Sequence, residues 1–126
     1  IRGDYPRRIA VLGEMLELGE ASIAGHLEVG RLAGQIGLAY LFLVGPLTKE
    51  IALGAQEFGF PLDRIIWANT REELEPKLLS LITSGDLILV KASQGGRLEK
   101  TVKKILANPE QAAKLLVRQD ASWDKI

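Results

Sequence analysis

Continuous hydrophobic runs, separated by amphipathic stretches, are the main pattern along this chain. Four such runs share a lack of polar alternation and end in a glycine or in polar residues, and they span 9–12, 39–44, 64–68 and 87–90. Runs of this kind are typical of strands covered on both faces, as in a parallel sheet. They predict four buried strands.

The stretches between these runs repeat hydrophobic residues every three or four positions, which is the period of one helix face. The first predicted helix has Ser22 as its N-cap and ends at Gly37, and its inner face carries Ile23, His26, Val29, Ala33 and Ile36. A second helix is predicted after Thr48 as N-cap, with Ile51, Ala55 and Phe58 inside. The pattern therefore places one helix after each of the first two strands.

Two further helices are predicted from their start signals. Thr70 and Glu73 form a capping box, Thr-x-x-Glu, although Pro76 then requires the helix to kink or to begin there. Asn108 followed by Pro109 predicts the start of a last helix, which carries Leu115 and Leu116.

The alternation of strands and helices predicts an α/β fold: a doubly wound, mainly parallel sheet with helices on both faces. The loops after the strands, at 13–19, 45–48, 69–70 and 91–96, then share one edge of the sheet. Open α/β sheets bind their ligands at that edge.

Composition narrows the possible functions. The 126 residues suit one domain, and the 16 basic and 16 acidic residues cancel, so nucleic acid is not an expected partner. The chain contains no cysteine, no apolar run of about 20 residues and no signal-peptide pattern, so we expect a cytoplasmic protein without a membrane partner. Residues 1–8 read as the end of a linker before a domain at 9–126, in a fragment of a longer chain.

Two phosphate-binding motifs are absent. The sequence has neither a G-x-x-x-x-G-K-[ST] loop nor a G-x-G-x-x-G after its first strand. It is therefore not a complete nucleotide-dependent enzyme of either type. A receiver-like domain is disfavoured as well, because the strand before Gly13 does not end in an acidic cluster.

The strings VLGEMLELGE and VKAS, with His26, Glu28, Val29 and Gly30 between them, resemble the C-terminal domain of the Mur ligases. The resemblance runs from about Arg8 to about Leu106 and is greatest to the branch whose first loop usually reads VLGDMxELG. It implies a Rossmann-like domain of a ligase that uses ATP and Mg²⁺, both bound mainly by a central domain that precedes this one in the family.

The loop after the fourth strand resembles the family's K-G-S-R loop, which implies that Lys91, Ser93, Gln94 and Arg97 bind the amine substrate. A cation, a hydroxyl and free backbone N–H groups suit a carboxylate. The loop departs from the family at Ala92 and at Gln94, which replaces an arginine, and Arg97 is a candidate for the missing charge. The alternative is structural: Lys91 snorkels at a strand end and Ser93 caps a helix.

The first loop supplies the other candidates. Glu14 stands where the family has aspartate, which implies that it faces the nucleotide or its phosphates once the domains close. Glu17 is either a functional carboxylate or a solvated loop charge. His26 is the only histidine and a candidate general base, although its apolar neighbours favour a packed, half-buried role. Asn69 is a further candidate on the same edge.

The resemblance implies that the whole enzyme joins D-alanyl-D-alanine to UDP-N-acetylmuramoyl-tripeptide through an acyl phosphate, for peptidoglycan synthesis. This domain would position the amine and close over its own central domain, and alone it would have no turnover. Two alternatives stay open: a non-catalytic α/β binding or interaction module, and a sibling Mur-type ligase with a different amino acid substrate.

Overall fold

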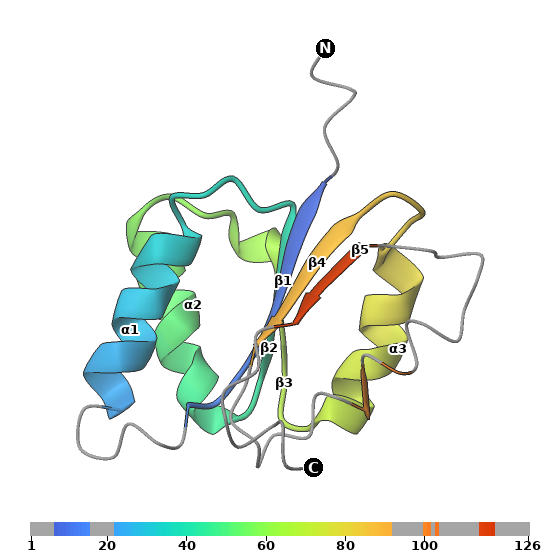
Figure 1. Cartoon of the computed structure of the whole chain (residues 1–126). Helices are drawn as coiled ribbons and strands as arrows, with labels where there is room; N and C mark the ends of the chain where they lie inside the picture. The colour runs from blue at the N-terminus through green and yellow to red at the C-terminus, as the bar shows by residue number, and fades with distance from the viewer. Residues whose placement is uncertain (1–6, 16–21, 92–99, 102, 104–113, 118–126) are drawn as a thin grey trace.

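The computed structural model describes residues 7–15, 22–91, 100–101, 103 and 114–117. In this part of the chain five parallel strands form one sheet, and they are β1 (Arg8–Gly13), β2 (Tyr40–Val44), β3 (Ile65–Ala68), β4 (Leu87–Lys91) and β5 (Lys114–Val117). Their order across the sheet is β3-β2-β1-β4-β5, which places β1 in the middle (Figure 1).

Helices cover both faces of this sheet, as Figure 1 shows. The described helices are α1 (Ser22–Ala33), α2 (Lys49–Glu57) and α3 (Arg71–Leu81), with short 3₁₀ turns η3 (Pro46–Thr48) and η4 (Leu62–Arg64). α1 and α2 lie on one face and α3 on the other. The predicted doubly wound parallel fold is confirmed.

Alternate residues of each central strand point into two separate cores. Ile9 and Val11 of β1 face α3, whereas Ala10 and Leu12 face α1 and α2. All four side chains are buried, because a parallel sheet with helices on both sides leaves neither face to solvent. The absence of polar alternation in the sequence has this physical cause.

α1 and α2 cross at two glycines. A Cβ on Gly30 would lie 2.0 Å from the Ile51 carbonyl oxygen, and one on Gly54 would lie 2.2 Å from the Leu27 carbonyl oxygen. The predicted inner face of α1 is confirmed at His26 and Ala33, which are buried together with Gly30. The prediction was wrong at Ile23, which is 61% exposed in the first turn of α1. It was also wrong at Ile36, which is 41% exposed and lies beyond Ala33, where the helix ends before the predicted Gly37.

The predicted start of α2 is confirmed, since Thr48 is the N-cap residue before Lys49, but the predicted inner face needs correction at Phe58. The Thr48 side chain makes no cap bond to the helix, because its hydroxyl donates to the Gly45 carbonyl oxygen at 2.6 Å. Phe58 is 51% exposed, since α2 ends at Glu57 and the chain reverses at Gly59, whose φ is +84°. Phe60, after that reversal, takes the buried place instead.

The capping box of α3 is confirmed with one shift. The Thr70 hydroxyl accepts a hydrogen bond from the Glu73 N–H, while the Glu73 carboxylate accepts one from the N–H of Asn69 rather than of Thr70. Pro76 lies inside α3, so the helix begins before it.

The last predicted helix was wrong where the structure describes it. Leu115 and Leu116 belong to β5 and pair with Ile88 and Leu89 of β4. A short apolar run fits a buried helix and a buried strand equally well, and here an open sheet edge decided the outcome. The predicted helix start at 108–111 lies outside the described residues.

Candidate functional site

The carboxyl ends of β1 and β4 form the topological switch point of the sheet. From the central β1 the chain passes through α1 to β2 on one side, whereas β4 arrives on the other side after α3. Doubly wound folds bind ligands beside the carboxyl ends of the strands at this point. Lys91, the last residue of β4, pairs with Leu12 of β1, so it stands beside the start of the first loop.

Glu14 reaches across the sheet edge to the loop after β2. Its Oε2 accepts a hydrogen bond of 2.8 Å from the backbone N–H of Leu47, at the start of the helical segment that leads into α2. Its side chain also fills the space beside Gly45, where an added Cβ would lie 2.6 Å from the Glu14 Cδ. The carboxylate thus has a partner inside this domain.

Trp67 of β3 supports the same loop from its other side. Its indole Nε1 donates to the Gly45 carbonyl oxygen at 2.9 Å and to the Thr48 hydroxyl at 3.1 Å. The Lys49 ammonium lies over the indole ring, 4.7 Å from its centre. The carboxyl edge from β1 to β3 is therefore joined by hydrogen bonds and is preorganised.

His26 is fully buried at the amino end of α1. Its Nε2 accepts a hydrogen bond of 3.0 Å from the Met15 N–H, and its Nδ1 lies 2.5 Å from the Ser22 carbonyl oxygen. The half-buried role expected for this residue understated its burial. Both ring nitrogens are engaged, so His26 has no lone pair available to act as a general base.

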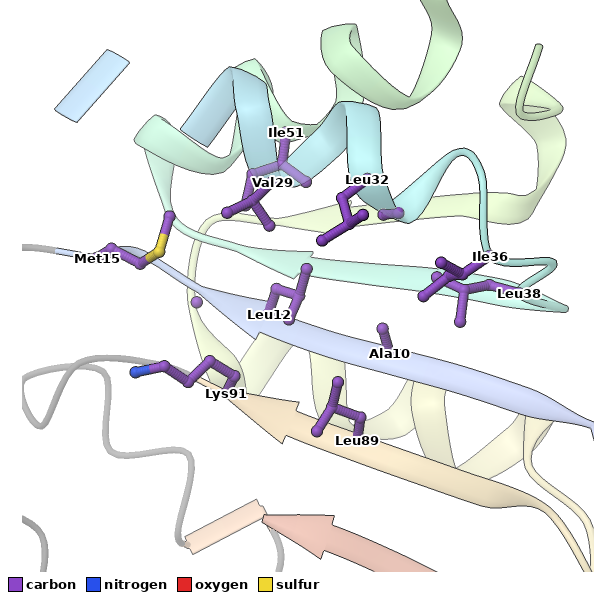
Figure 2. Close-up of a pocket in the computed structure, with 12 residues that line it drawn as sticks. Ala10, Leu12, Met15, Val29, Leu32, Ile36, Leu38, Ile51, Leu89 and Lys91 are labelled. Carbon is purple, nitrogen blue, oxygen red and sulfur yellow. The ribbon is translucent and has the colours of Figure 1, made fainter. Parts of the chain in front are cut away.

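An apolar cavity of about 320 Å³ opens at the switch point and runs beneath α1 along β1 (Figure 2). Twelve residues line it: Ala10, Leu12, Gly13, Met15, Val29, Leu32, Ala33, Ile36, Leu38, Ile51, Leu89 and Lys91. Figure 2 shows Met15 and the Lys91 ammonium at the same end, past the carboxyl ends of β1 and β4. Lys91 is the one charged residue of this lining, and no described carboxylate forms an ion pair with it.

Of the other candidate site residues, the structure describes one and leaves four outside the described residues. Asn69 is exposed on the same edge, after β3, and its backbone N–H is held by Glu73. Ser93, Gln94, Arg97 and Glu17 lie outside the described residues. Beyond that loop, the Thr101 hydroxyl donates to Glu75 of α3 at 2.7 Å, in a buried contact. This contact joins Thr101 to α3.

Sequence reasoning missed the partners of Glu14 and His26. Each of these side chains accepts a hydrogen bond from a backbone N–H group, and backbone groups have no sequence signature of their own. Gly45, ending the second strand just before Pro46, was the one available signal that something approaches the backbone there.

The described residues include no group of three or more histidine, cysteine, aspartate or glutamate side chains that could hold a metal ion. No described helix is long and apolar enough to cross a membrane. The described part of the site offers one cation, Lys91, at one end of an apolar cavity whose edge also carries the hydrogen-bonded Glu14. A cation in this position can orient an anionic substrate.

The fold and this site define a doubly wound α/β domain with its ligand edge at the β1–β4 switch point. A model of the family described as "Mur ligase, glutamate ligase domain" matches residues 1–94. The chain belongs to this family of Mur ligase domains.

Known proteins with similar sequences are ligases. The chain is 35% identical over 105 residues to a UDP-N-acetylmuramoyl-tripeptide–D-alanyl-D-alanine ligase of Bacillus subtilis, with 83% of this chain and 23% of the relative covered. It is 37% identical over 109 residues to the ligase of the same name from Synechocystis, with 82% and 22% covered. The chain thus spans less than a quarter of the length of these relatives.

Solved structures agree on the fold. A crystal structure of MurF from Acinetobacter baumannii superimposes with a TM-score of 0.68 at 23% identity, with 81% of this chain and 22% of that chain covered. A second crystal structure of the same protein gives a TM-score of 0.67. The shared fold covers the domain and not the remainder of those chains.

Proposed function

We propose that this chain is the amine-positioning domain of an ATP-dependent ligase that joins D-alanyl-D-alanine to UDP-N-acetylmuramoyl-tripeptide in peptidoglycan precursor synthesis. Family membership and the names of its relatives support the ligase class and these two substrates. The observation that carries the proposal is the Lys91 ammonium at the switch point, with which no described carboxylate forms an ion pair, since a dipeptide presents a carboxylate to such a cation.

In this proposal the domain supplies position rather than bond-breaking groups. Lys91, with Ser93, Gln94 and Arg97 as expected partners, holds the dipeptide carboxylate and so aims its amine at the acyl phosphate. The amine nitrogen forms the new amide bond, the carbonyl–phosphate bond breaks, and phosphate and a proton leave. Holding the two reactants together supplies most of the benefit, and closure excludes water from a hydrolysable intermediate.

ATP and Mg²⁺ are proposed to bind mainly outside this chain, in the central domain of the full protein. The described residues do not fit a metal site, and the carboxylate of Glu14 is already bonded to Leu47. We therefore assign no step of the reaction to a metal held here. In this proposal Glu14 faces the nucleotide while its carboxylate stays bonded to Leu47.

The test is phosphate release by the full-length ligase with ATP, Mg²⁺ and the tripeptide substrate, with and without D-alanyl-D-alanine. The proposal expects release that depends on the dipeptide. A Lys91→Met variant should raise the KM for the dipeptide by about tenfold or more, because a charge-assisted bond is lost. Lys77→Met is the matched control, since Lys77 is exposed on α3, away from the carboxyl edge.

Three outcomes separate the alternatives. Release that requires a different amino acid indicates a sibling ligase. A ligase whose activity is unchanged by Lys91→Met has no use for this site, and this domain is then a non-catalytic module. Substrate-dependent ATP hydrolysis by the isolated domain contradicts the expectation that it has no turnover of its own.

A further inference from the structure

The imidazole of His26 joins two segments that flank the first loop. Met15 is the second residue after β1, and Ser22 is the first residue of α1. The ring accepts from the Met15 N–H at 3.0 Å and contacts the Ser22 carbonyl oxygen at 2.5 Å. A single fully buried side chain therefore connects the carboxyl end of β1 to the first turn of α1.

The partners define the protonation of the ring. A backbone N–H can only donate, so Nε2 must carry a lone pair toward Met15, and a carbonyl oxygen can only accept, so Nδ1 must carry the proton toward Ser22. The ring is thus the neutral Nδ1–H tautomer. Each nitrogen has one bond and one partner, which leaves neither for chemistry with a substrate.

The bond to Met15 holds the segment that forms one side of the switch point. Glu14 precedes Met15, and its carboxylate is bonded to the Leu47 N–H on the opposite side. The Glu14–Met15 segment is therefore held by its backbone from α1 and by a side chain from the loop after β2. The Met15 side chain lies at the same end of the cavity as Lys91 (Figure 2).

We propose that His26 is a positioning residue: by fixing the Met15 backbone it sets where Glu14 and Met15 stand relative to Lys91 at the carboxyl edge. This inference rests on the proposed ligase function for its effect on rate. The interaction itself is local and can be measured apart from that function. A displacement of about 1 Å in a positioning group costs up to about 100-fold in rate, so the effect is measurable.

Two amide variants separate the two bonds of His26. Glutamine places its amide oxygen about where Nε2 lies, so His26→Gln keeps an acceptor for the Met15 N–H and loses the donor to Ser22. Asparagine places its amide nitrogen about where Nδ1 lies, so His26→Asn keeps the Ser22 bond and loses the Met15 bond. Each variant is neutral and polar and loses one hydrogen bond, so both should lower thermal stability by similar amounts.

Activity should not follow stability in this pair. In the full-length ligase we expect His26→Asn to lower kcat for dipeptide-dependent phosphate release by about tenfold or more. His26→Gln should stay within about threefold of wild type, because it keeps the bond to Met15. Equal losses in both variants, or a normal kcat in His26→Asn, would show that the Met15 bond only stabilises the fold, and would overturn the proposal. A greater loss in His26→Gln would overturn it as well, because it would assign the effect to the Ser22 bond.

Amide hydrogen exchange tests the interaction where a variant does not fold. In the wild-type protein the Met15 amide should exchange far more slowly than an unprotected amide, although it lies beyond the last residue of β1. Exchange at the unprotected rate overturns the proposal without any variant. A wild-type protein that releases no phosphate with the dipeptide contradicts the proposed function instead, and Met15 exchange still reports on His26.

Discussion

The carboxylate of Glu14 accepts the backbone N–H of Leu47 at 2.8 Å and so joins the loop after β1 to the loop after β2. The family resemblance implies a nucleotide-facing role for this position, where aspartate is usual. The longer glutamate side chain spans the gap to the next loop and has a structural partner there. This relationship makes Glu14 a test of how the carboxyl edge is held together.

Shortening Glu14 should therefore cost stability even though the charge is kept. We expect Glu14→Asp to lose the bond to Leu47 and to lower the free energy of unfolding by about 1–2 kcal/mol. Glu14→Gln keeps an oxygen acceptor at the same reach, so it should cost less, about 0.5 kcal/mol. Denaturant unfolding of both variants gives the comparison. A more stable Asp variant than Gln variant would mean that the charge, and not the reach, matters at this position.

Gly45 should resist substitution for two separable reasons. Its φ of +103° strains any residue with a Cβ, and that Cβ would lie 2.6 Å from the Glu14 side chain. Gly59 has a φ of +84° with nothing within 4 Å, so Gly59→Ala measures the backbone strain alone, about 1 kcal/mol. We expect Gly45→Ala to lose about 2–3 kcal/mol, because Gly45 also has a ψ of 155°, a conformation essentially restricted to glycine, and because Glu14 must be displaced. Equal losses in the two variants would contradict both reasons.

Four of the five described strands could be predicted to within one residue at each end, because a short apolar run bounded by turn residues fits a strand that is buried on both faces. What could not be predicted depends on contacts between distant segments. Ile23 has the right helical spacing for the inner face and is nevertheless exposed, because burial in the first turn of α1 depends on what packs against that turn, which no periodicity records. Leu115 and Leu116 form a strand because the edge of β4 is available to them.

The candidate site was predicted in the same uneven way. The position of Lys91 and Glu14 at one edge follows from the topology alone, since both come at the carboxyl ends of parallel strands. The hydrogen-bond partners of the site residues do not follow from the topology. The partner of Glu14 and the two partners of His26 are main-chain atoms, whose positions are set by the tertiary fold. Residue types therefore indicated where chemistry was to be sought and left open which side chains are free for it.

The crossing of α1 and α2 should be the most sensitive packing contact in the described part of the chain. A Cβ added to each of three glycines would lie close to a backbone carbonyl oxygen. The distance from that Cβ to the oxygen would be 2.0 Å at Gly30, 2.2 Å at Gly54 and 2.8 Å at Gly34. Backbone cannot move as a side-chain end does, so Gly30→Ala and Gly54→Ala should each cost about 3 kcal/mol or more. Gly34→Ala should cost less than either. Thermal unfolding ranks the three, and a ranking with Gly34 first would contradict this packing.

The last prediction concerns acid stability and the ion pair between Arg7 and Asp86. Arg7 Nε and Nη2 donate to the two Asp86 oxygens at 2.9 and 2.8 Å, and the Thr83 N–H also donates to Asp86. Burial by itself raises the pKa of Asp86, but the hydrogen bonds from Arg7 and Thr83 outweigh it and hold the pKa below its ordinary value of 3.8. The pKa of Arg7 is raised, chiefly by its hydrogen bond to Asp86, and the shift has no effect near neutral pH because Arg7 is charged there in any case.

Because the folded pKa of Asp86 lies below the unfolded one, its contribution is complete above about pH 4 and is lost as the pH falls through the folded value. Arg7→Gln should therefore lower the free energy of unfolding at pH 7 by about 1–2 kcal/mol, the smaller end of the range for an uncompensated buried carboxylate. The Arg7 side chain is 40% exposed, and solvent screening is the reason for that smaller value.

The difference between wild type and Arg7→Gln should shrink as the pH falls below 3.8, because protonated Asp86 no longer needs a cation. Arg8→Gln is the control, since Arg8 is exposed and the variant removes the same charge without touching Asp86. Denaturant unfolding at pH 7 and at pH 3 gives both differences. A stability difference that stays constant with pH, or that appears equally in Arg8→Gln, would show that net charge rather than this ion pair is responsible.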